Sequence, residues 1–170
     1  MTPVPTHYER LGLPGRFSVD SADLERAYLA RSREVHPDYH AESADRAAKL
    51  AESAAVNEAY STLRDPFRRA EYLLNVSLGD TPQVPVALSP AILIQAMELR
   101  ERLESAGSDA GELAVLDGDL GALIDAEHAA VATLFAGPPL PGTFAAIRGH
   151  LNAWKTLASL RRSVHDAITE

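Results

Sequence analysis

The stretch Arg31-Ser-Arg-Glu-Val-His-Pro-Asp-Tyr-His40 decides the fold of the first half of the chain. Before it, apolar residues recur at helical spacing through Leu24, Ala27 and Tyr28. Proline disfavours helical dihedral angles at the residue before it, so we expect this helix to end just before His36. After it, residues 44–63 are rich in alanine and contain no glycine or proline, which predicts a second long helix. The tripeptide at 36–38 is therefore predicted to be a short loop between two helices.

The composition describes an ordinary globular protein of 170 residues, with 46% apolar and 24% charged residues. The net charge of −8 argues against nonspecific binding to nucleic acid or to an anionic membrane surface. The chain has no cysteine, which excludes disulfides, thiol nucleophiles and cysteine-ligated metal clusters. No secretory signal and no apolar run of about 20 residues is present, so we expect a cytoplasmic protein without membrane spans.

Helical periodicity runs through the whole chain, and no stretch alternates with period two, so we expect an all-α fold. About four helices occupy residues 1–78, and the alanine-rich helix among them is expected to bury a long side. The predicted buried residues of that helix are Ala47, Leu50, Ala51, Ala54, Ala55, Ala59 and Leu63. Residues 79–89 hold one glycine and two prolines in their first seven positions and are predicted to be a linker. Residues 90–170 are predicted to form a three-helix bundle.

The loop at 36–38 allows three interpretations. A metal site could use His36, Asp38 and His40, since imidazole and carboxylate groups are suitable ligands. The loop could also be a simple turn in which Asp38 caps the next segment, although that explains neither His36 nor Tyr39. The third interpretation is a rigid tip that presents polar groups to a partner, as exposed loops often do.

His36-Pro37-Asp38 between two helices resembles the signature of the J domain, the module that activates DnaK-type chaperone ATPases. Asn57-Glu-Ala-Tyr60 and Leu63-Arg-Asp-Pro66 resemble the end of the third J-domain helix and the following turn. The chain lacks the Gly/Phe-rich segment and the CxxC repeats of general DnaJ proteins. The resemblance covers the whole first half of the chain.

Further motifs resemble one family, the HscB co-chaperones of iron–sulfur cluster assembly. These motifs are Arg69-Ala-Glu-Tyr-Leu-Leu74, the spacing Gly12-Leu-Pro…Phe17…Asp20, and Met97-Glu-Leu-Arg-Glu101 after the linker. The family joins a J domain to a C-terminal three-helix bundle. The resemblance thus implies a co-chaperone that catalyses nothing itself and needs no cofactor or metal. The implied partners are an HscA-like DnaK-type chaperone and an IscU-type scaffold protein.

The resemblance also implies which residues dock on the chaperone. They are the loop residues His36, Pro37 and Asp38 and the basic residues Arg26, Arg31 and Arg33. Residues 22–35 hold three arginines and three acidic residues, so the helix has no net charge. We therefore expect modest affinity and a weaker salt dependence than for a strongly basic J domain.

For the scaffold, the resemblance implies a site on the first helix after the linker, with an aromatic residue from the last helix. The implied residues are Leu93, Ile94, Met97, Glu98, Glu101 and Trp154. Periodicity alone favours another interpretation, in which the residues on the first helix form a wide core stripe with a solvated acidic end. Trp154 could likewise fill the core of the bundle. Two rival functions remain: a J-protein for a different client, and a metal-dependent enzyme that uses His36, Asp38 and His40.

Overall fold

The computed structural model describes residues 5–35, 46–81, 85–140 and 142–169. These residues form seven helices and no strand, so the all-α prediction is confirmed. The chain divides into two compact units, Met1–Gly79 and Asp80–Glu170. No helix in the described ranges is both long and apolar enough to cross a membrane. The loop residues 36–40, and with them the His-Pro-Asp tripeptide, lie outside the described residues.

The first unit begins with the short helix α1 (His7–Leu11), which is defined by its caps. Thr6 accepts a hydrogen bond from the backbone of Glu9, and the Glu9 side chain accepts one from the backbone of Thr6, which is a reciprocal capping box. Gly12 ends the helix in the left-handed region at φ 67°, where a residue with a Cβ would be strained. The buried side chains of Tyr8 and Leu11 attach α1 to the helices that follow.

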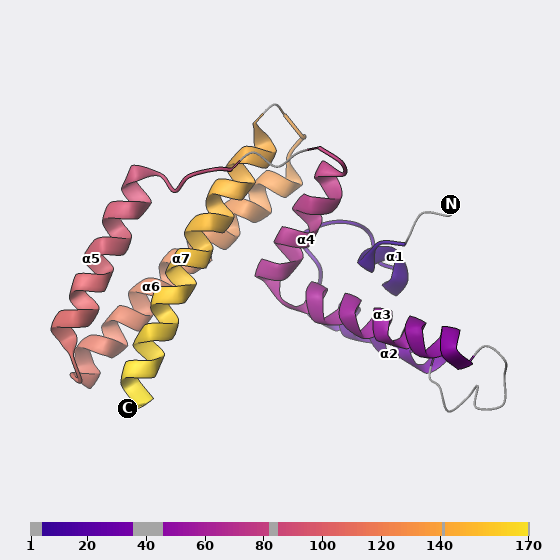
Figure 1. The fold of residues 1–170 in the computed structure, drawn as a ribbon, viewed down its shortest axis with the longest axis horizontal. Coiled ribbons are helices and arrows are strands. Elements are labelled where there is room, and N and C mark those ends of the chain that lie inside the picture. Colours follow the sequence, from indigo (N-terminus) through magenta and orange to yellow (C-terminus); the bar gives the residue numbers. More distant parts are fainter. Residues whose placement is uncertain (1–4, 36–45, 82–84, 141, 170) are drawn as a thin grey trace. The chain divides into compact units, whose positions relative to one another are not determined.

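The helices α2 (Ser21–Glu34) and α3 (Arg46–Arg64) pack against each other (Figure 1). Asp20 caps α2 by accepting hydrogen bonds from the backbones of Ala22 and Asp23 at 2.9 and 3.0 Å. Helix α2 ends at Glu34, just before the predicted loop, as expected from the proline at position 37. The core of this unit is made by the buried residues Tyr8, Leu11, Phe17, Leu24, Val35, Val56, Ala59, Leu63, Ala70, Leu73 and Leu74.

The predicted buried side of α3 is wrong over its first three turns. Ala47, Ala51 and Ala54 are exposed, and Leu50 is 60% exposed. The buried face instead follows Val56, Ala59 and Leu63, and continues backwards to the half-buried Ser53 and Glu52. Alanine loses little by facing water and favours a helix on any side, so a run of alanines does not mark the buried side.

The last helix of the first unit is α4 (Pro66–Leu78), with Asp65 as its N-cap and proline at its first position. It buries Ala70, Leu73 and Leu74. The Arg69 side chain is also buried and donates a hydrogen bond to the backbone carbonyl of Leu63 at 2.7 Å, which fixes α4 to the end of α3.

The second unit consists of α5 (Pro90–Ala106), α6 (Ala110–Ala136) and α7 (Thr143–Thr169). The two 27-residue helices α6 and α7 run side by side along their length, and α5 is shorter (Figure 1). The core that joins all three helices consists of Leu99, Leu113, Leu116, Leu120, Leu157, Leu160 and Val164. The Asn152 amide donates a hydrogen bond to the carbonyl of Val86 at 2.7 Å, which attaches the segment before α5 to α7. The three helices expected after the linker are therefore present.

Candidate docking surfaces

The outer face of α2 is the first candidate surface. Arg26 and Arg33 are seven residues apart, so they lie on one side of the helix, and both are exposed. Leu29 lies between them on the same side and is 46% exposed, so this side of α2 combines one apolar side chain with two cations. Arg26 forms an ion pair with Asp23 one turn earlier, so part of its charge is already balanced.

Arg31 lies on a different side of α2 from Arg26 and Arg33. It is half-buried and donates to Glu34 at 2.7 Å and, across the helix pair, to Glu52 of α3 at 3.4 Å. The hydrogen bond to Glu34 is the main reason that the pKa of Arg31 is raised above its ordinary value. The surroundings of Arg31 thus indicate a structural role in the hairpin, whereas its predicted contact with the chaperone stays a prediction.

The predicted contacts of His36, Pro37 and Asp38 fall outside the described residues, as does the alternative metal site at His36, Asp38 and His40. Within the described ranges, no group of three or more histidine, aspartate or glutamate side chains could hold a metal ion. The structure therefore places only the α2 part of the predicted chaperone-docking surface.

The second candidate surface is on α5. Leu93, Ile94 and Met97 are 48%, 58% and 64% exposed, and we call these three residues the α5 strip. The core side of the same helix is made by Leu99, with Ala96 and Leu103 partly buried against it. The interpretation as a wide core stripe is thus wrong for the α5 strip, because about half or more of each of its side chains is exposed. Glu98 and Glu101 are exposed beside it.

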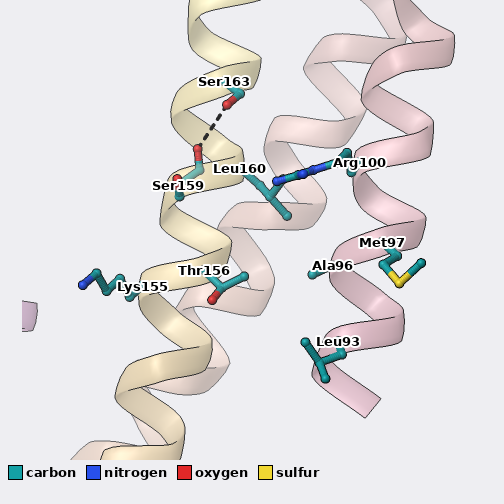
Figure 2. Close-up of a pocket in the computed structure, with 9 residues that line it drawn as sticks. All are labelled: Leu93, Ala96, Met97, Arg100, Lys155, Thr156, Ser159, Leu160 and Ser163. Atoms are coloured by element: carbon teal, nitrogen blue, oxygen red, sulfur yellow. Dashed lines mark hydrogen bonds between the residues drawn. The ribbon is translucent and has the colours of Figure 1, made fainter. Parts of the chain in front are cut away.

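A groove of about 440 Å³ lies between α5 and α7, next to the α5 strip (Figure 2). We call it the α5–α7 groove, and its lining residues are Leu93, Ala96, Met97, Arg100, Lys155, Thr156, Ser159, Leu160 and Ser163. Figure 2 shows Arg100 extended from α5 towards Leu160 on α7. Neither this groove nor Arg100 is among the sites predicted from the sequence. The available signal was that Arg100 follows Leu93 by seven residues and so shares its side of the helix.

Trp154, the predicted aromatic contribution of α7, is buried in the bundle rather than displayed beside the α5 strip. It is 8% exposed, and its ring lies edge-on against His128 of α6 at a centroid distance of 5.3 Å. The next residue, Lys155, lines the groove instead. The environment of Trp154 therefore corresponds to the core-filling alternative, and a direct contact with a partner would reach only a small part of its side chain.

Comparison with known proteins agrees with this architecture. Residues 6–72 match the family model described as the DnaJ domain, and residues 88–165 match that described as the HSCB C-terminal oligomerisation domain. A J domain defines the chain as a co-chaperone of a DnaK-type chaperone, and the ATPase concerned is that of the partner.

Two curated relatives, each described as a co-chaperone protein HscB homolog, are similar over most of their length. The protein from Bordetella petrii is 43% identical over 117 residues, which cover 67% of this chain and 69% of the relative. The protein from Ralstonia nicotianae is 42% identical over 135 residues, which cover 78% and 76%. The chain therefore belongs to the HscB family, the J-domain co-chaperones of iron–sulfur cluster assembly.

Solved structures give the same result for the fold. The chaperone HscB from Vibrio cholerae superposes with a TM-score of 0.79 at 30% identity and covers 95% of this chain and 96% of its own. Human co-chaperone protein HscB superposes with a TM-score of 0.84, covering 97% and 83%, and at 23% identity it supports the fold alone. The J domain, the three-helix unit and the family expected from the sequence motifs are confirmed.

Proposed function

We propose that this chain binds an HscA-like chaperone through α2 and the segment after it, holds an IscU-type scaffold on α5, and thereby delivers the scaffold while stimulating the chaperone's ATPase. The observation that carries the proposal is the exposure of the α5 strip on a helix whose opposite side is packed in the core. The three large apolar side chains of the strip are exposed to water. Each one that a partner covers would contribute on the order of 1–2 kcal/mol to binding, because removing apolar surface from water is favourable. Such a cluster is typical of a binding surface.

The charges beside the strip support a protein partner. Glu98 and Glu101 are exposed next to the α5 strip. An apolar centre with charged residues at its edge is the usual composition of a small protein interface, in which the centre supplies the affinity and the charges select the partner. The scaffold is thus expected to offer an apolar patch with basic residues on the side that meets Glu98 and Glu101.

On the chaperone side, support comes from α2. Arg26, Leu29 and Arg33 share an exposed side of the helix that leads directly to the His-Pro-Asp segment. Because the two predicted surfaces belong to one chain, a scaffold bound to α5 would meet the chaperone at a raised effective concentration. This is the physical basis for expecting that scaffold and co-chaperone act synergistically on the ATPase.

The test measures ATPase turnover of a purified HscA-like chaperone, with and without an IscU-type scaffold. His36→Gln is expected to abolish the stimulation in both cases. Met97→Asp places a charge in the α5 strip and is expected to remove the synergy with the scaffold. Val115→Asp is the matched control, since Val115 is 55% exposed but lies on α6 and outside the strip.

Two results would contradict the proposal. Stimulation by the wild type without any synergy would indicate a J-protein that serves a different client. Absence of stimulation, together with stoichiometric zinc in the purified protein, would support the metal-dependent alternative at His36, Asp38 and His40.

A further inference from the structure

Four charged side chains join α1, α3 and the end of α2 in one continuous series of contacts. Arg10 of α1 donates to Oε2 of Glu52 at 2.8 Å, and Arg31 of α2 donates to Oε1 of the same carboxylate at 3.4 Å. Arg31 also donates to Glu34, the last residue of α2, at 2.7 Å. We call Arg10, Glu52, Arg31 and Glu34 the ion-pair chain. It begins on α1, a helix that carries none of the residues predicted to dock on the chaperone.

Arg10 fixes the carboxylate on which Arg31 depends. The Arg10 side chain is mostly buried, and the Glu52 side chain is partly buried. Removing one partner from such a pair leaves a charge without compensation, so the pair holds its two groups in place more firmly than an exposed pair does. Each arginine uses one of the two carboxylate oxygens of Glu52. The orientation that Arg10 gives to this carboxylate therefore also sets where Arg31 finds its acceptor.

The last turn of α2 relies on Arg31 because it lacks a common type of helix ending. Many helices end with a glycine in the left-handed region, whereas the C-cap of α2 is Val35 at φ −103°. The Val35 amide donates to the carbonyl of Arg31 at 3.2 Å, and the Val35 side chain is buried. The Arg31 side chain spans the same turn to reach Glu34. Arg31 thus holds this turn through its backbone and its side chain, a few residues before His36 in the sequence.

We propose that Arg10 and Glu52 are positioning residues for stimulation of the chaperone's ATPase, because through Arg31 they hold the last turn of α2 in place. The inference rests on the proposed function and extends it to residues outside both docking surfaces. It assigns to α1 an influence on the ATPase of the partner, although α1 itself is not expected to touch the chaperone.

Loss of the ion-pair chain is expected to act after the chaperone has bound. Arg26, Leu29 and Arg33 lie on a different side of α2 from Arg31, so a substitution of Arg10 leaves them available for binding. The bound co-chaperone then has its last α2 turn in place for only part of the time, and stimulation at saturation falls in that proportion. A loss of folded protein acts differently: it raises the half-saturating concentration of co-chaperone and leaves stimulation at saturation unchanged.

The test measures ATPase turnover of a purified HscA-like chaperone against the concentration of the full-length co-chaperone. Arg10→Gln is expected to lower stimulation at saturation roughly three- to fivefold, which is the effect of one partly buried ion pair on an equilibrium. The half-saturating concentration is expected to change by less than about twofold, since the docking side of α2 is intact. Circular dichroism verifies that the variant is folded at the assay temperature. Glu52→Gln is expected to have the same effect and replaces Arg10→Gln if the latter does not fold.

Thr6→Ala is the matched control for the stability of α1. The Thr6 side chain caps α1 by accepting a hydrogen bond from the backbone of Glu9 at 3.2 Å, so its loss destabilises the helix without touching the ion-pair chain. Thr6→Ala is expected to lower the melting temperature about as much as Arg10→Gln does, but to leave stimulation at saturation unchanged.

Hydrogen exchange followed by NMR gives a second readout at the turn itself. The Val35 amide is expected to exchange about fivefold faster in Arg10→Gln than in Thr6→Ala, because only the first substitution loosens the contacts of Arg31. Equal exchange of this amide in the two variants would overturn the inference.

Two ATPase results would also overturn it. One is full stimulation at saturation by Arg10→Gln. The other is an equal loss in Arg10→Gln and Thr6→Ala, which would show that only the stability of α1 matters. The proposed function fails in a different way: if the wild type does not stimulate the chaperone, or if His36→Gln stimulates as the wild type does, the chaperone-docking assignment is wrong and the inference falls with it.

Discussion

Arg31 of α2 and Glu52 of α3 form an ion pair across the helical hairpin, with 3.4 Å between Nη2 and Oε1. The other carboxylate oxygen of Glu52 accepts a hydrogen bond from Arg10 of α1 at 2.8 Å. A single half-buried glutamate therefore joins α1, α2 and α3. The position of α2, which carries the predicted chaperone-docking residues, depends on this carboxylate.

Glu52→Gln is expected to lower the free energy of unfolding of the first unit by about 1–2 kcal/mol, because the Arg10 side chain is only 14% exposed and would lose its charged partner. Urea unfolding followed by circular dichroism measures this loss. A double-mutant cycle with Arg10→Gln is expected to show coupling between the two residues. Strictly additive effects would show that the pair contributes nothing to stability.

The double variant Arg26→Glu, Arg33→Glu is expected to reduce chaperone stimulation severalfold while leaving the unfolding free energy within about 0.5 kcal/mol of wild type, since both side chains are exposed. Arg31→Ala, in contrast, is expected to lower the free energy of unfolding clearly, because the contact with Glu52 is lost. Steady-state ATPase rates and thermal unfolding of the same preparations distinguish the two classes. Full stimulation by the double variant would remove this face of α2 from the docking surface.

Salt provides a separate measure of the same surface. Because residues 22–35 have three arginines and three acidic residues, and Arg26 and Arg31 each pair with an acidic neighbour, the stimulated ATPase rate is expected to change little between low and physiological salt. The measurement is the ATPase rate across a potassium chloride series, with the unstimulated chaperone as the control. A steep loss of stimulation would mean that positive charge dominates docking in spite of these pairs.

Trp154→Ala is expected to destabilise the second unit by about 3 kcal/mol or more, because it would leave a cavity between α6 and α7 beside His128. Trp154→Phe keeps most of the ring and is expected to cost much less. If Trp154 acts through the core, scaffold affinity follows stability, and Trp154→Phe binds as the wild type does. A large loss of affinity in a fully stable Trp154→Phe variant would instead indicate that Trp154 contacts the scaffold directly.

The sequence was most informative where local rules are strong. Asp20, Asp65 and Ser89 cap their helices as their positions before helical periodicity indicate, and proline follows two of these caps. The buried side of α3 was not predictable, since exposed and buried alanines are equally compatible with a helix. Here the decisive factors were long-range: the packing of Val56 and the pairing of Glu52 with residues of α1 and α2.

In the candidate sites, too, some features were predictable from the sequence and others depended on long-range packing. The exposure of the α5 strip was predictable only from the family resemblance, because the apolar periodicity of this helix fits a wide core stripe as well. The environment of Trp154 was not, since the rotation of α7 about its axis depends on contacts with α6 that no local pattern records. The α5–α7 groove with Arg100 was not predictable either, because its lining comes from two helices that are far apart in the sequence.

The last prediction concerns acid stability of the second unit, which depends on Asp117. Its carboxylate accepts two hydrogen bonds from Arg161 and lies 2.7 Å from Nε2 of His165, so it joins α6 to α7. The hydrogen bond from Arg161 is the main cause that lowers the pKa of Asp117 from 3.8 to about 2. The folded state therefore binds this proton less readily than the unfolded chain does.

The stabilisation from this carboxylate is present in full above the unfolded pKa, near pH 4, and is lost as the pH falls through about 2. Because the site is partly exposed, solvent screening limits the contribution to about 1 kcal/mol at neutral pH. Asp117→Asn is expected to lower the unfolding free energy by that amount at pH 7 and to have a diminishing effect as the pH falls from 4 towards 2. Urea unfolding of wild type and variant at each pH measures the difference, and a difference that stays constant over this range would mean that ionisation of Asp117 does not stabilise the helix pair.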